Sequence, residues 1–451
     1  MIRMQLSEAA AAIGAQLIGN DGWFEGVSTD TRSISRGEVF CALEGPNFDG
    51  HDHCSKAEIA GAAGAIVQRA VRSSLATLTV DDSRRALGRL AGAWRRRFSI
   101  PVVGVTGSNG KTTVKEMIAS ILHANVLATK GNLNNDIGVP KTLLQLDDEH
   151  EFAVIEMGAS HIGEIKWLAE ISQPLVGVVT LCAPAHLEGF GTIDAVAEAK
   201  GELYAGLLKD GTAVINADDA YADYWSTIAT DRRVVRFAME QAADVTAESI
   251  TNLGIGYGMQ FSLRLPSSEI DIQLPFDGKH NIANALAAAA SAYSLDIAPA
   301  TIKLGLENAK RVGGRLCVIA GVRGARIIDD TYNANPTSLA AALDMIALEP
   351  GKKWLVLGDM GELGPSAEDI HRDTGLAARK AGIDRLYSFG ELAAIAAASF
   401  GDGGQAYRDI ARLTDVLISD LAPEVTLLVK GSRAMRMERV VEALTGATQA
   451  C

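Results

Sequence analysis

The sequence has little of several features that would indicate nucleic-acid, membrane or disulfide chemistry. Basic residues are the minority, with 42 Lys and Arg against 55 Asp and Glu, so the formal net charge is −13. This charge excludes broad electrostatic capture of nucleic acid or of an anionic membrane. The five cysteines, an odd number without C-x-x-C spacing, indicate reduced thiols. The first residues lack the apolar core of a signal peptide, so we expect a cytoplasmic protein without membrane insertion.

Internal repeats and low-complexity segments are absent as well, and the composition is that of a folded chain. Of the 451 residues, 48% are hydrophobic and 22% are charged. At roughly 150 residues per domain this length predicts about three domains. We expect a monomer whose binding sites for any anionic substrate are built from a few concentrated cations.

The order of apolar runs divides the chain. Residues up to 82 combine short strand-like runs with a loop-rich middle. From Pro101 buried strands alternate with helices, which is typical of a mostly parallel sheet covered on both faces. After Gly313-Gly314 a second such series begins, of the doubly wound, Rossmann-like type. We therefore predict an α/β protein with a small N-terminal domain, a central phosphate-loop domain and a C-terminal domain, at residues 1–82, 83–314 and 315–451.

The strongest motif is Gly104-Val-Thr-Gly-Ser-Asn-Gly-Lys-Thr-Thr113, which follows a buried strand and precedes a helix. Glycines allow backbone N–H groups to turn toward an anion, and the helix N-terminus adds positive potential. Lys111 can reach the β- and γ-phosphates, and the Thr112 hydroxyl can ligate Mg²⁺. Val105 breaks the strict pattern, but the Lys-Thr-Thr ending favours a phosphate loop over a structural turn. The predicted ATP-binding residues here are Gly107, Ser108, Asn109, Gly110, Lys111, Thr112 and Thr113.

Three more positions fit the same chemistry. Glu156 ends the strand Phe152–Ile155, where a carboxylate can face the phosphate loop and hold Mg²⁺. Arg315 follows the glycine pair and can reach a phosphate if the domains close, although a plain hinge explains this segment as well. Asp330 follows a strand, where an acid can bind ribose hydroxyls.

A different group, His51-Asp-His53-Cys54, has metal-ligand residue types. No second set of His or Cys completes four ligands at a recognisable spacing, so a loop that contacts substrate is favoured over zinc.

Together the motifs resemble the Mur ligase family, the ATP-dependent amide-bond ligases of peptidoglycan precursor synthesis. The resemblance covers nearly the whole chain. Ser28-Thr-Asp-Thr-Arg32 resembles the uridine-nucleotide segment of the family, and Glu156-Met-Gly158 resembles its magnesium segment. Asp330-Thr-Tyr-Asn-Ala-Asn-Pro336 and Lys430-Gly-Ser-Arg433 resemble the branch that adds D-alanyl-D-alanine to UDP-N-acetylmuramoyl-tripeptide.

The resemblance also implies residue roles. Thr112 and Glu156 would hold one Mg²⁺ and His186 would help to hold a second, while Lys200 occupies the position of a carbamoylated lysine in relatives. With Lys111 these form the expected catalytic set of Lys111, Glu156, His186 and Lys200. ATP would also contact Asn281, Arg315 and Asp330. The implied substrate contacts are Ser28, Asp30, Arg32, Ser160 and Asn333, and Ser160 departs from the Asn that this branch commonly carries.

The implied reaction consumes ATP with Mg²⁺ and gives ADP and phosphate through an acyl phosphate. One alternative is another ligase of the superfamily, either the enzyme of the preceding amino-acid-adding step or a folylpolyglutamate-type enzyme. The Ser28–His51 segment argues against the folate enzyme, and Tyr332-Asn-Ala-Asn-Pro336 argues against the earlier step. Another alternative is a phosphate-loop nucleotide switch, which leaves His186, Lys200 and the extra C-terminal domain unexplained.

Overall fold

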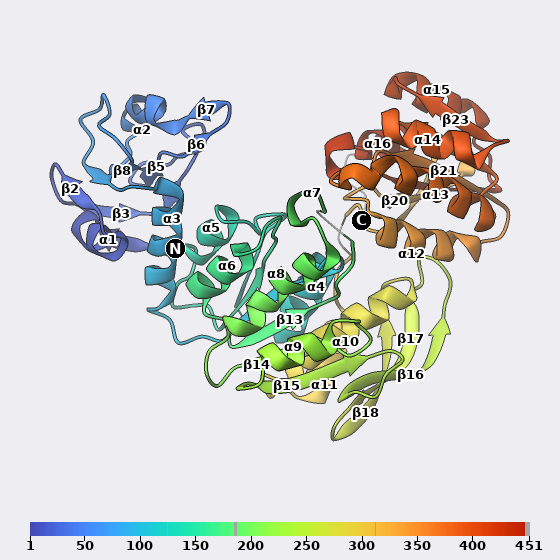
Figure 1. The fold of residues 1–451 in the computed structure, drawn as a ribbon, viewed down its shortest axis with the longest axis horizontal. Helices are drawn as coiled ribbons and strands as arrows, with labels where there is room; N and C mark the ends of the chain where they lie inside the picture. The colour runs from blue at the N-terminus through green and yellow to red at the C-terminus, as the bar shows by residue number, and fades with distance from the viewer. Residues whose placement is uncertain (124, 185–186, 312, 447–451) are drawn as a thin grey trace.

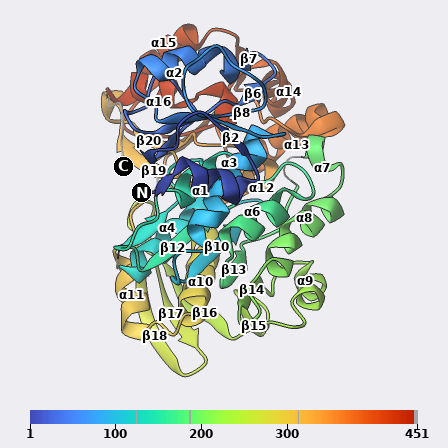
Figure 2. The same ribbon diagram turned by 90° about the vertical axis from the view of Figure 1, so that its left-hand side faces the viewer.

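The computed structural model describes residues 1–123, 125–184, 187–311 and 313–446. They form three bodies, coloured blue, green to yellow, and orange to red in Figure 1. Each body has its own sheet, which confirms the predicted three-domain α/β architecture. The first and last bodies both lie on the same side of the central one (Figure 2). Within the described residues, every helix is too short or too polar to cross a bilayer.

The N-terminal body is built on a small mixed sheet with the strand order β2-β9-β8-β5-β4. Four of these strands are parallel, and β2 pairs antiparallel at one edge. Asp82 begins α3 by accepting a hydrogen bond from the backbone N–H of Arg85, and α3 then runs to the central body. The elements are β1 (Arg3–Gln5), α1 (Leu6–Ile13), β2 (Gln16–Ile18), β3 (Trp23–Glu25), β4 (Val27–Ser28), β5 (Val39–Cys41), β6 (Glu44–Gly45), β7 (Phe48–Asp49), α2 (Cys54–Ile59), β8 (Gly64–Val67), β9 (Thr77–Thr79) and α3 (Ser83–Arg95).

The central body holds nine strands in the order β11-β12-β10-β13-β14-β15-β16-β17-β18. The first seven strands, from β11 to β16 in this order, are parallel, as the apolar runs predict. Strands β17 and β18 then extend the sheet beyond β16 in antiparallel pairing, which the apolar runs did not predict. The strands are β10 (Val102–Thr106), β11 (Val126–Ala128), β12 (Phe152–Glu156), β13 (Val176–Val179), β14 (Thr212–Asn216), β15 (Arg233–Ala238), β16 (Val245–Asn252), β17 (Met259–Leu265) and β18 (Ser268–Leu274).

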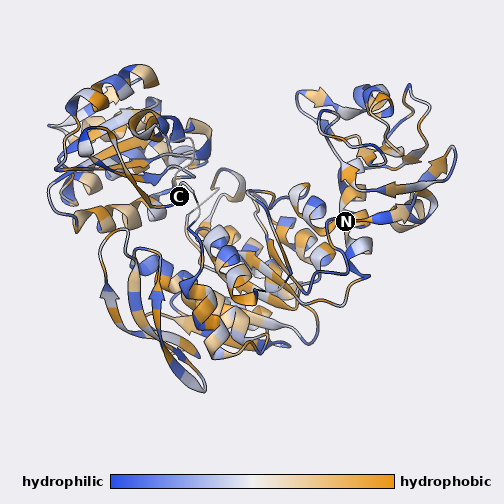
Figure 3. Ribbon diagram, turned by 180° about the vertical axis from the view of Figure 1, so that it is seen from behind, coloured by the Kyte–Doolittle hydropathy of each residue, from blue (hydrophilic) through white to orange (hydrophobic). Residues whose placement is uncertain are grey.

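Helices cover both faces of this sheet. Val103 and Val105 lie in one apolar core and Val102 lies in the other, because side chains alternate along a strand. Hydrophobic and hydrophilic residues alternate around the helices of all three bodies (Figure 3). One face carries α4 (Lys111–Leu122), α10 (Lys279–Tyr293) and α11 (Pro299–Glu307), and the other carries α5 (Gly138–Leu143), α6 (Glu164–Ser172) and α8 (Ile193–Ala205).

The C-terminal body has six strands in the order β19-β20-β24-β21-β22-β23, all parallel except β19 at the edge. This is the predicted doubly wound arrangement. The strands are β19 (Cys317–Ala320), β20 (Arg326–Asp330), β21 (Lys352–Gly358), β22 (Arg385–Phe389), β23 (Gly404–Tyr407) and β24 (Val425–Lys430). The helices are α12 (Pro336–Ala347), α13 (Ala367–Lys380), α14 (Glu391–Phe400), α15 (Ile410–Asp420) and α16 (Glu438–Thr445).

A second contact joins the C-terminal body to the central one, besides the chain connection near Gly313. The turn between β16 and β17 places Ile255, only 4% exposed, in the core of the C-terminal body beside Leu316 and Ile328. Arg326 of β20 donates to the Ile255 carbonyl. Asp277 fixes the turn from the central side by accepting N–H bonds from the glycines at 256 and 258.

Candidate active site

The phosphate loop lies between β10 and α4, and two of its glycines are required by close neighbours. Gly107 has φ +148°, and a Cβ there would fall 1.8 Å from Thr180 Oγ1. Gly110 has φ +82°, and its Cβ would fall 2.3 Å from Asn284 Oδ1. No residue other than glycine fits these positions, so the backbone can approach a bound anion closely.

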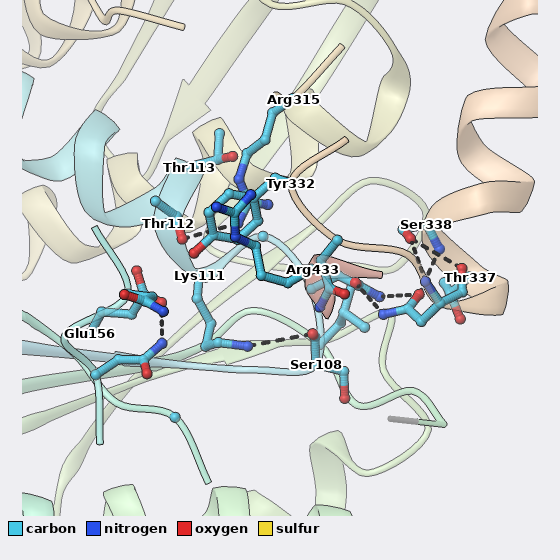
Figure 4. A pocket seen from close by; sticks show the side chains of 18 of the residues that line it. Ser108, Lys111, Thr112, Thr113, Glu156, Arg315, Tyr332, Thr337, Ser338 and Arg433 are labelled. Atoms are coloured by element: carbon cyan, nitrogen blue, oxygen red, sulfur yellow. Dashed lines mark hydrogen bonds between the residues drawn. The ribbon is translucent and has the colours of Figure 1, made fainter. Parts of the chain in front are cut away.

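Lys111 begins α4 and turns back over this loop. Its Nζ donates to the Gly107 carbonyl at 2.7 Å (Figure 4). Burial lowers the pKa of Lys111, and the nearby Glu156 carboxylate opposes that shift. The ammonium is therefore short of compensating negative charge, which an incoming phosphate would supply.

Glu156 ends β12 beside the phosphate loop and is 1% exposed. Its Oε1 accepts a hydrogen bond from Asn134 Nδ2 at 2.7 Å, whereas its buried Oε2 has no hydrogen-bond partner. Its backbone N–H donates to Thr129 Oγ1, which holds the strand end in place. An orphaned carboxylate oxygen near the Thr112 hydroxyl offers the hard oxygen ligands that Mg²⁺ prefers.

The segment after β13 is fixed to the phosphate loop. The Ser108 backbone N–H donates to the Leu181 carbonyl, and Ser108 Oγ donates to the Ala183 carbonyl at 2.8 Å. Asp219, in the turn after β14, holds the same segment by accepting the Cys182 N–H at 2.6 Å. His186 lies outside the described residues, so its predicted metal role stays a prediction.

Lys200 lies in α8 and is 4% exposed. Burial, with the positive charge of Lys111 as the next cause, lowers its pKa to about 7. A substantial neutral fraction at physiological pH makes this amine nucleophilic.

Helix α10 contributes an amide pair to the other side of the loop. Asn281 Nδ2 donates to the Asp277 carbonyl at 2.8 Å, and Asn281 Oδ1 accepts from Asn284 Nδ2 at 3.0 Å. The neighbouring His280 is half-buried, and loss of solvation lowers its pKa to about 4 and leaves it neutral.

The C-terminal body brings five further side chains to the same place. Arg315 donates to Thr112 Oγ1 at 3.1 Å, and its guanidinium lies 4.3 Å from the centroid of the Tyr332 ring. Asp330 is buried and bonded to Lys430 Nζ at 2.5 Å. Burial raises the pKa of Asp330, and Lys430 opposes that shift. Asn335 Nδ2 donates to Asn109 Oδ1 at 2.7 Å, which ties α12 to the phosphate loop.

Side chains of the phosphate loop, β12, α10 and the C-terminal body surround one cavity of about 670 Å³ between the central and C-terminal bodies (Figure 4). The cavity brings together most of the residues predicted from the sequence to bind ATP or metal. Those that line it are Ser108, Asn109, Gly110, Lys111, Thr112, Thr113, Glu156, Asn281, Arg315 and Asp330. Ser160 and Asn333, two of the expected substrate contacts, line it as well, whereas Gly107 and Lys200 do not.

The residues expected to contact the uridine nucleotide lie in the N-terminal body, outside this cavity. Ser28 ends β4, and Asp30 forms a two-bond ion pair with Arg32. Hydrogen bonds from Arg32 lower the pKa of Asp30 to about 2. His51, from the segment considered for metal, has Nδ1 against Asp49 at 2.6 Å and accepts the Gln68 N–H at Nε2, so both ring nitrogens serve the fold. Among the described residues, no group of three or more His, Cys, Asp and Glu is arranged to hold a metal.

Family models and relatives match this arrangement. The Mur ligase middle domain matches residues 105–292, the Mur ligase glutamate ligase domain matches residues 314–433, and the Mur ligase family catalytic domain matches residues 24–95. The UDP-N-acetylmuramoyl-tripeptide--D-alanyl-D-alanine ligase of Escherichia coli is 43% identical over 449 residues, covering 98% of this chain and 99% of that protein. The chain belongs to the Mur ligase family.

Solved structures agree with this assignment. A crystal structure of MurF from Acinetobacter baumannii superposes with a TM-score of 0.92 at 34% identity and covers 98% of both chains. MurF ligase from Thermotoga maritima, solved in complex with ADP, superposes with a TM-score of 0.80 at 29% identity, and the match covers 93% of this chain and 96% of that one. The Mur ligase fold predicted from the motifs is therefore confirmed.

Several residues of this Mur ligase site escaped the sequence reasoning. Asn134 and Tyr332 carry no local signal, because their partners Glu156 and Arg315 lie elsewhere in the chain. Asn284 could have been found, since it lies one helical turn after Asn281. Lys430 and Arg433 belong to a segment that the sequence analysis noted but to which it gave no residue roles.

Proposed function

We propose that this Mur ligase joins D-alanyl-D-alanine to UDP-N-acetylmuramoyl-tripeptide and converts ATP to ADP and phosphate in peptidoglycan precursor synthesis. The observation that carries the proposal is the single cavity in which the phosphate loop and Glu156 face Arg315 and Asp330 of the C-terminal body. The name of the full-length relative with 43% identity supplies the two substrates. ATP dependence is common to the family.

In the first stage, the terminal carboxylate of the tripeptide attacks the γ-phosphorus of ATP. An acyl phosphate forms and ADP leaves. The barrier is the repulsion between a carboxylate and a polyphosphate, so fixed positive charge lowers it. Lys111 of the central body and Arg315 of the C-terminal body supply that charge beside the phosphate loop.

In the second stage, the neutral amine of D-alanyl-D-alanine attacks the acyl carbon, and phosphate leaves. The acyl phosphate must be kept from water until the amine arrives. The contacts of Arg315 with Thr112 and of Asn335 with Asn109 join the two bodies across the cavity, and closer approach of the bodies on substrate binding would restrict water.

Magnesium fits the residues that are present. The unpartnered Oε2 of Glu156 and the Thr112 hydroxyl would hold it, and Asn134 orients the carboxylate through its other oxygen. When bound, Mg²⁺ would neutralise phosphate charge. We assign His186 to a second such site on the resemblance alone.

We also propose that Lys200 is carbamoylated. The lowered pKa of about 7 leaves part of the amine neutral, the form that adds to carbon dioxide. The product would place a carboxylate near Lys111 and replace one buried cation with an anion.

The proposed division of labour follows the three bodies. Residues 1–82 would bind the UDP portion with Ser28, Asp30 and Arg32, residues 83–314 would bind ATP, and residues 315–451 would close on ATP and bind the dipeptide. Ser160 and Asn333 would contact substrate. We propose that the enzyme is a cytoplasmic monomer.

The test measures phosphate release from ATP by the purified chain. UDP-N-acetylmuramoyl-tripeptide and D-alanyl-D-alanine are added separately and together, and the product is identified by mass spectrometry. Steady release that needs both substrates, with a UDP-pentapeptide product, supports the ligase. Release that ignores both substrates would instead support a nucleotide switch.

A further inference from the structure

The proposed second substrate carries a charge that takes no part in bond formation. Its amine must be neutral to attack, but its terminal carboxylate stays ionised at neutral pH. An extended dipeptide spans about 7 Å, so this carboxylate lies well away from the reacting amine. Burying an unpaired carboxylate is costly, so the enzyme needs a cation for it apart from those that bind the triphosphate.

Most basic side chains around the cavity already have a strong partner or another task. Lys111 and Arg315 face the phosphate loop. Lys430 is 2% exposed and is held by Asp330 and by the Asn333 carbonyl. His280 is half-buried, and loss of solvation lowers its pKa to about 4, so it is neutral. Among the described lining residues, this leaves Arg84, His161 and Arg433, each in a half-exposed ion pair.

Position separates these three. Arg84 begins α3, next to the N-terminal body, and His161 precedes α6 of the central body, so both lie on the side assigned to the nucleotide-linked substrate. Arg433 belongs to the C-terminal body and follows β24. Ligands of doubly wound sheets bind at the carboxyl ends of the strands, which is where Arg433 lies in the cavity (Figure 4).

The present partner of Arg433 is easily replaced. Its Nη1 lies 3.1 Å from Glu438 Oε1, and the two side chains are 59% and 30% exposed. An ion pair this exposed contributes about 0–1 kcal/mol, so a ligand can take over the guanidinium at little cost. The planar guanidinium also matches a carboxylate with two parallel hydrogen bonds.

We propose that Arg433 binds the terminal carboxylate of the incoming D-alanyl-D-alanine. The inference rests on the proposed function, since it names a contact for the second substrate of that reaction. Arg433 is thus a specificity residue that favours a free dipeptide over an amidated one and leaves the chemistry at ATP unchanged.

The experiment compares wild type and Arg433→Gln with D-alanyl-D-alanine and with its C-terminal amide. With the free acid, the variant is expected to raise the KM for the dipeptide by about 10- to 100-fold, as the loss of a charged hydrogen bond would. The KM values for ATP and UDP-tripeptide should stay within about twofold. With the amide, wild type and variant should have equal KM values, because no carboxylate is present to lose its partner.

Arg436→Gln is the matched control, since Arg436 is exposed, lies three residues away and is not part of the cavity lining. Arg436→Gln should change neither the KM for D-alanyl-D-alanine nor the KM for its amide. The proposal is overturned if Arg433→Gln leaves the KM for the acid unchanged, or if it weakens acid and amide equally. Failure of the proposed function would look different, because wild type itself would then form no product with D-alanyl-D-alanine.

Discussion

Single buried charges decide what the phosphate loop of this enzyme can do. Lys111 contacts the Gly107 carbonyl from inside the cavity, and burial already lowers its pKa. Removing the ammonium relieves this burial and takes away the cation that the γ-phosphate needs. The same change thus leaves folding intact and damages catalysis.

Lys111→Ala is therefore expected to lower ATP-dependent phosphate release by at least about 100-fold, the size of loss seen when one transition-state contact is removed. Thermal unfolding of the variant should match wild type. Lys209→Ala, on an exposed loop, serves as the control. Retained activity in Lys111→Ala would remove this residue from its assigned role.

Lys200 should make the stability of the protein depend on pH. Its ordinary pKa of 10.5 falls to about 7 in the folded chain because the charged form is buried. Between these two pH values the unfolded chain binds more protons than the folded chain, so the free energy of unfolding rises with pH. Below pH 7 Lys200 is charged in both states, and the full free-energy cost of burying its charge destabilises the folded protein.

The measurement is the difference in unfolding free energy between wild type and Lys200→Met, in buffer free of carbon dioxide. From pH 7 toward pH 10, the unfolding free energy of wild type should rise relative to that of Lys200→Met. A difference that stays flat across this range would show that Lys200 titrates normally in the folded protein.

Sequence reasoning at this scale succeeds where function lies in a contiguous segment and fails where partners come from distant segments. The contiguous segment at 108–113 lines the cavity, and Gly107 lies behind it against Thr180, while the ATP-binding roles of these residues stay predictions. The ion pair of Asp330 with Lys430 joins positions 100 residues apart and leaves no local pattern. The partner of such a charge depends on the packing of two strands, β20 and β24.

At the scale of elements, helix α4 is positioned by close contact with α11. A Cβ on Gly305 of α11 would fall 2.2 Å from the Ile121 Cα, and Ser120 Oγ donates to the Gly305 carbonyl at 2.7 Å. The two helices touch backbone to backbone here, because a side chain would hold them apart. Since α4 begins at Lys111, this crossing also sets the position of the phosphate loop.

Gly305→Ala is expected to lower the free energy of unfolding by about 1–3 kcal/mol, as overpacking does, and to raise the KM for ATP. Chemical denaturation and steady-state kinetics measure the two effects. Gly92→Ala in α3 is the matched control, because its nearest neighbour would lie at an ordinary 3.4 Å. An equal effect of the two substitutions would contradict the proposed crossing.

Strand prediction worked for buried elements and failed for half-exposed ones. The continuous apolar run Val102-Val103-Gly104-Val105 was read correctly as the central strand β10. In contrast, β18 alternates exposed and buried positions over Ser268–Leu274, with charged residues on its outer face. A search for apolar runs passes over such a strand, although the alternation is itself the signature of an antiparallel edge.

At the scale of the whole molecule, the protein consists of three bodies, and the proposed reaction would use all of them. The residues assigned to the nucleotide-linked substrate lie in the first body and those for the dipeptide in the last, and the two bodies are separated in Figure 1. Length predicted the number of bodies. Their arrangement depends on a few contacts between them, and neither length nor composition predicts such contacts.

We expect the C-terminal body to move toward the others about Gly313-Gly314 when substrates bind. Small-angle scattering or fluorescence transfer between the first and last bodies should report a shorter distance with an ATP analogue, UDP-tripeptide and dipeptide than for the free enzyme. The analogue should be required, since Arg315 and Asp330 face the phosphate loop across this joint. Equal distances in the free and fully liganded states would contradict the hinge.

The packing of Ile255 in the core of the C-terminal body limits the directions in which that body can rotate. A body tied to its neighbour by one flexible connection can turn about any axis, whereas a body tied at two separate points can turn only about the line that joins them. The connection near Gly313 and the turn at Ile255 are two such points. Once the contacts of Arg315 with Thr112 and of Asn335 with Asn109 are open, a swing about these two points would follow a single arc, and it would bring Arg315 and Asp330 back to the phosphate loop in one orientation.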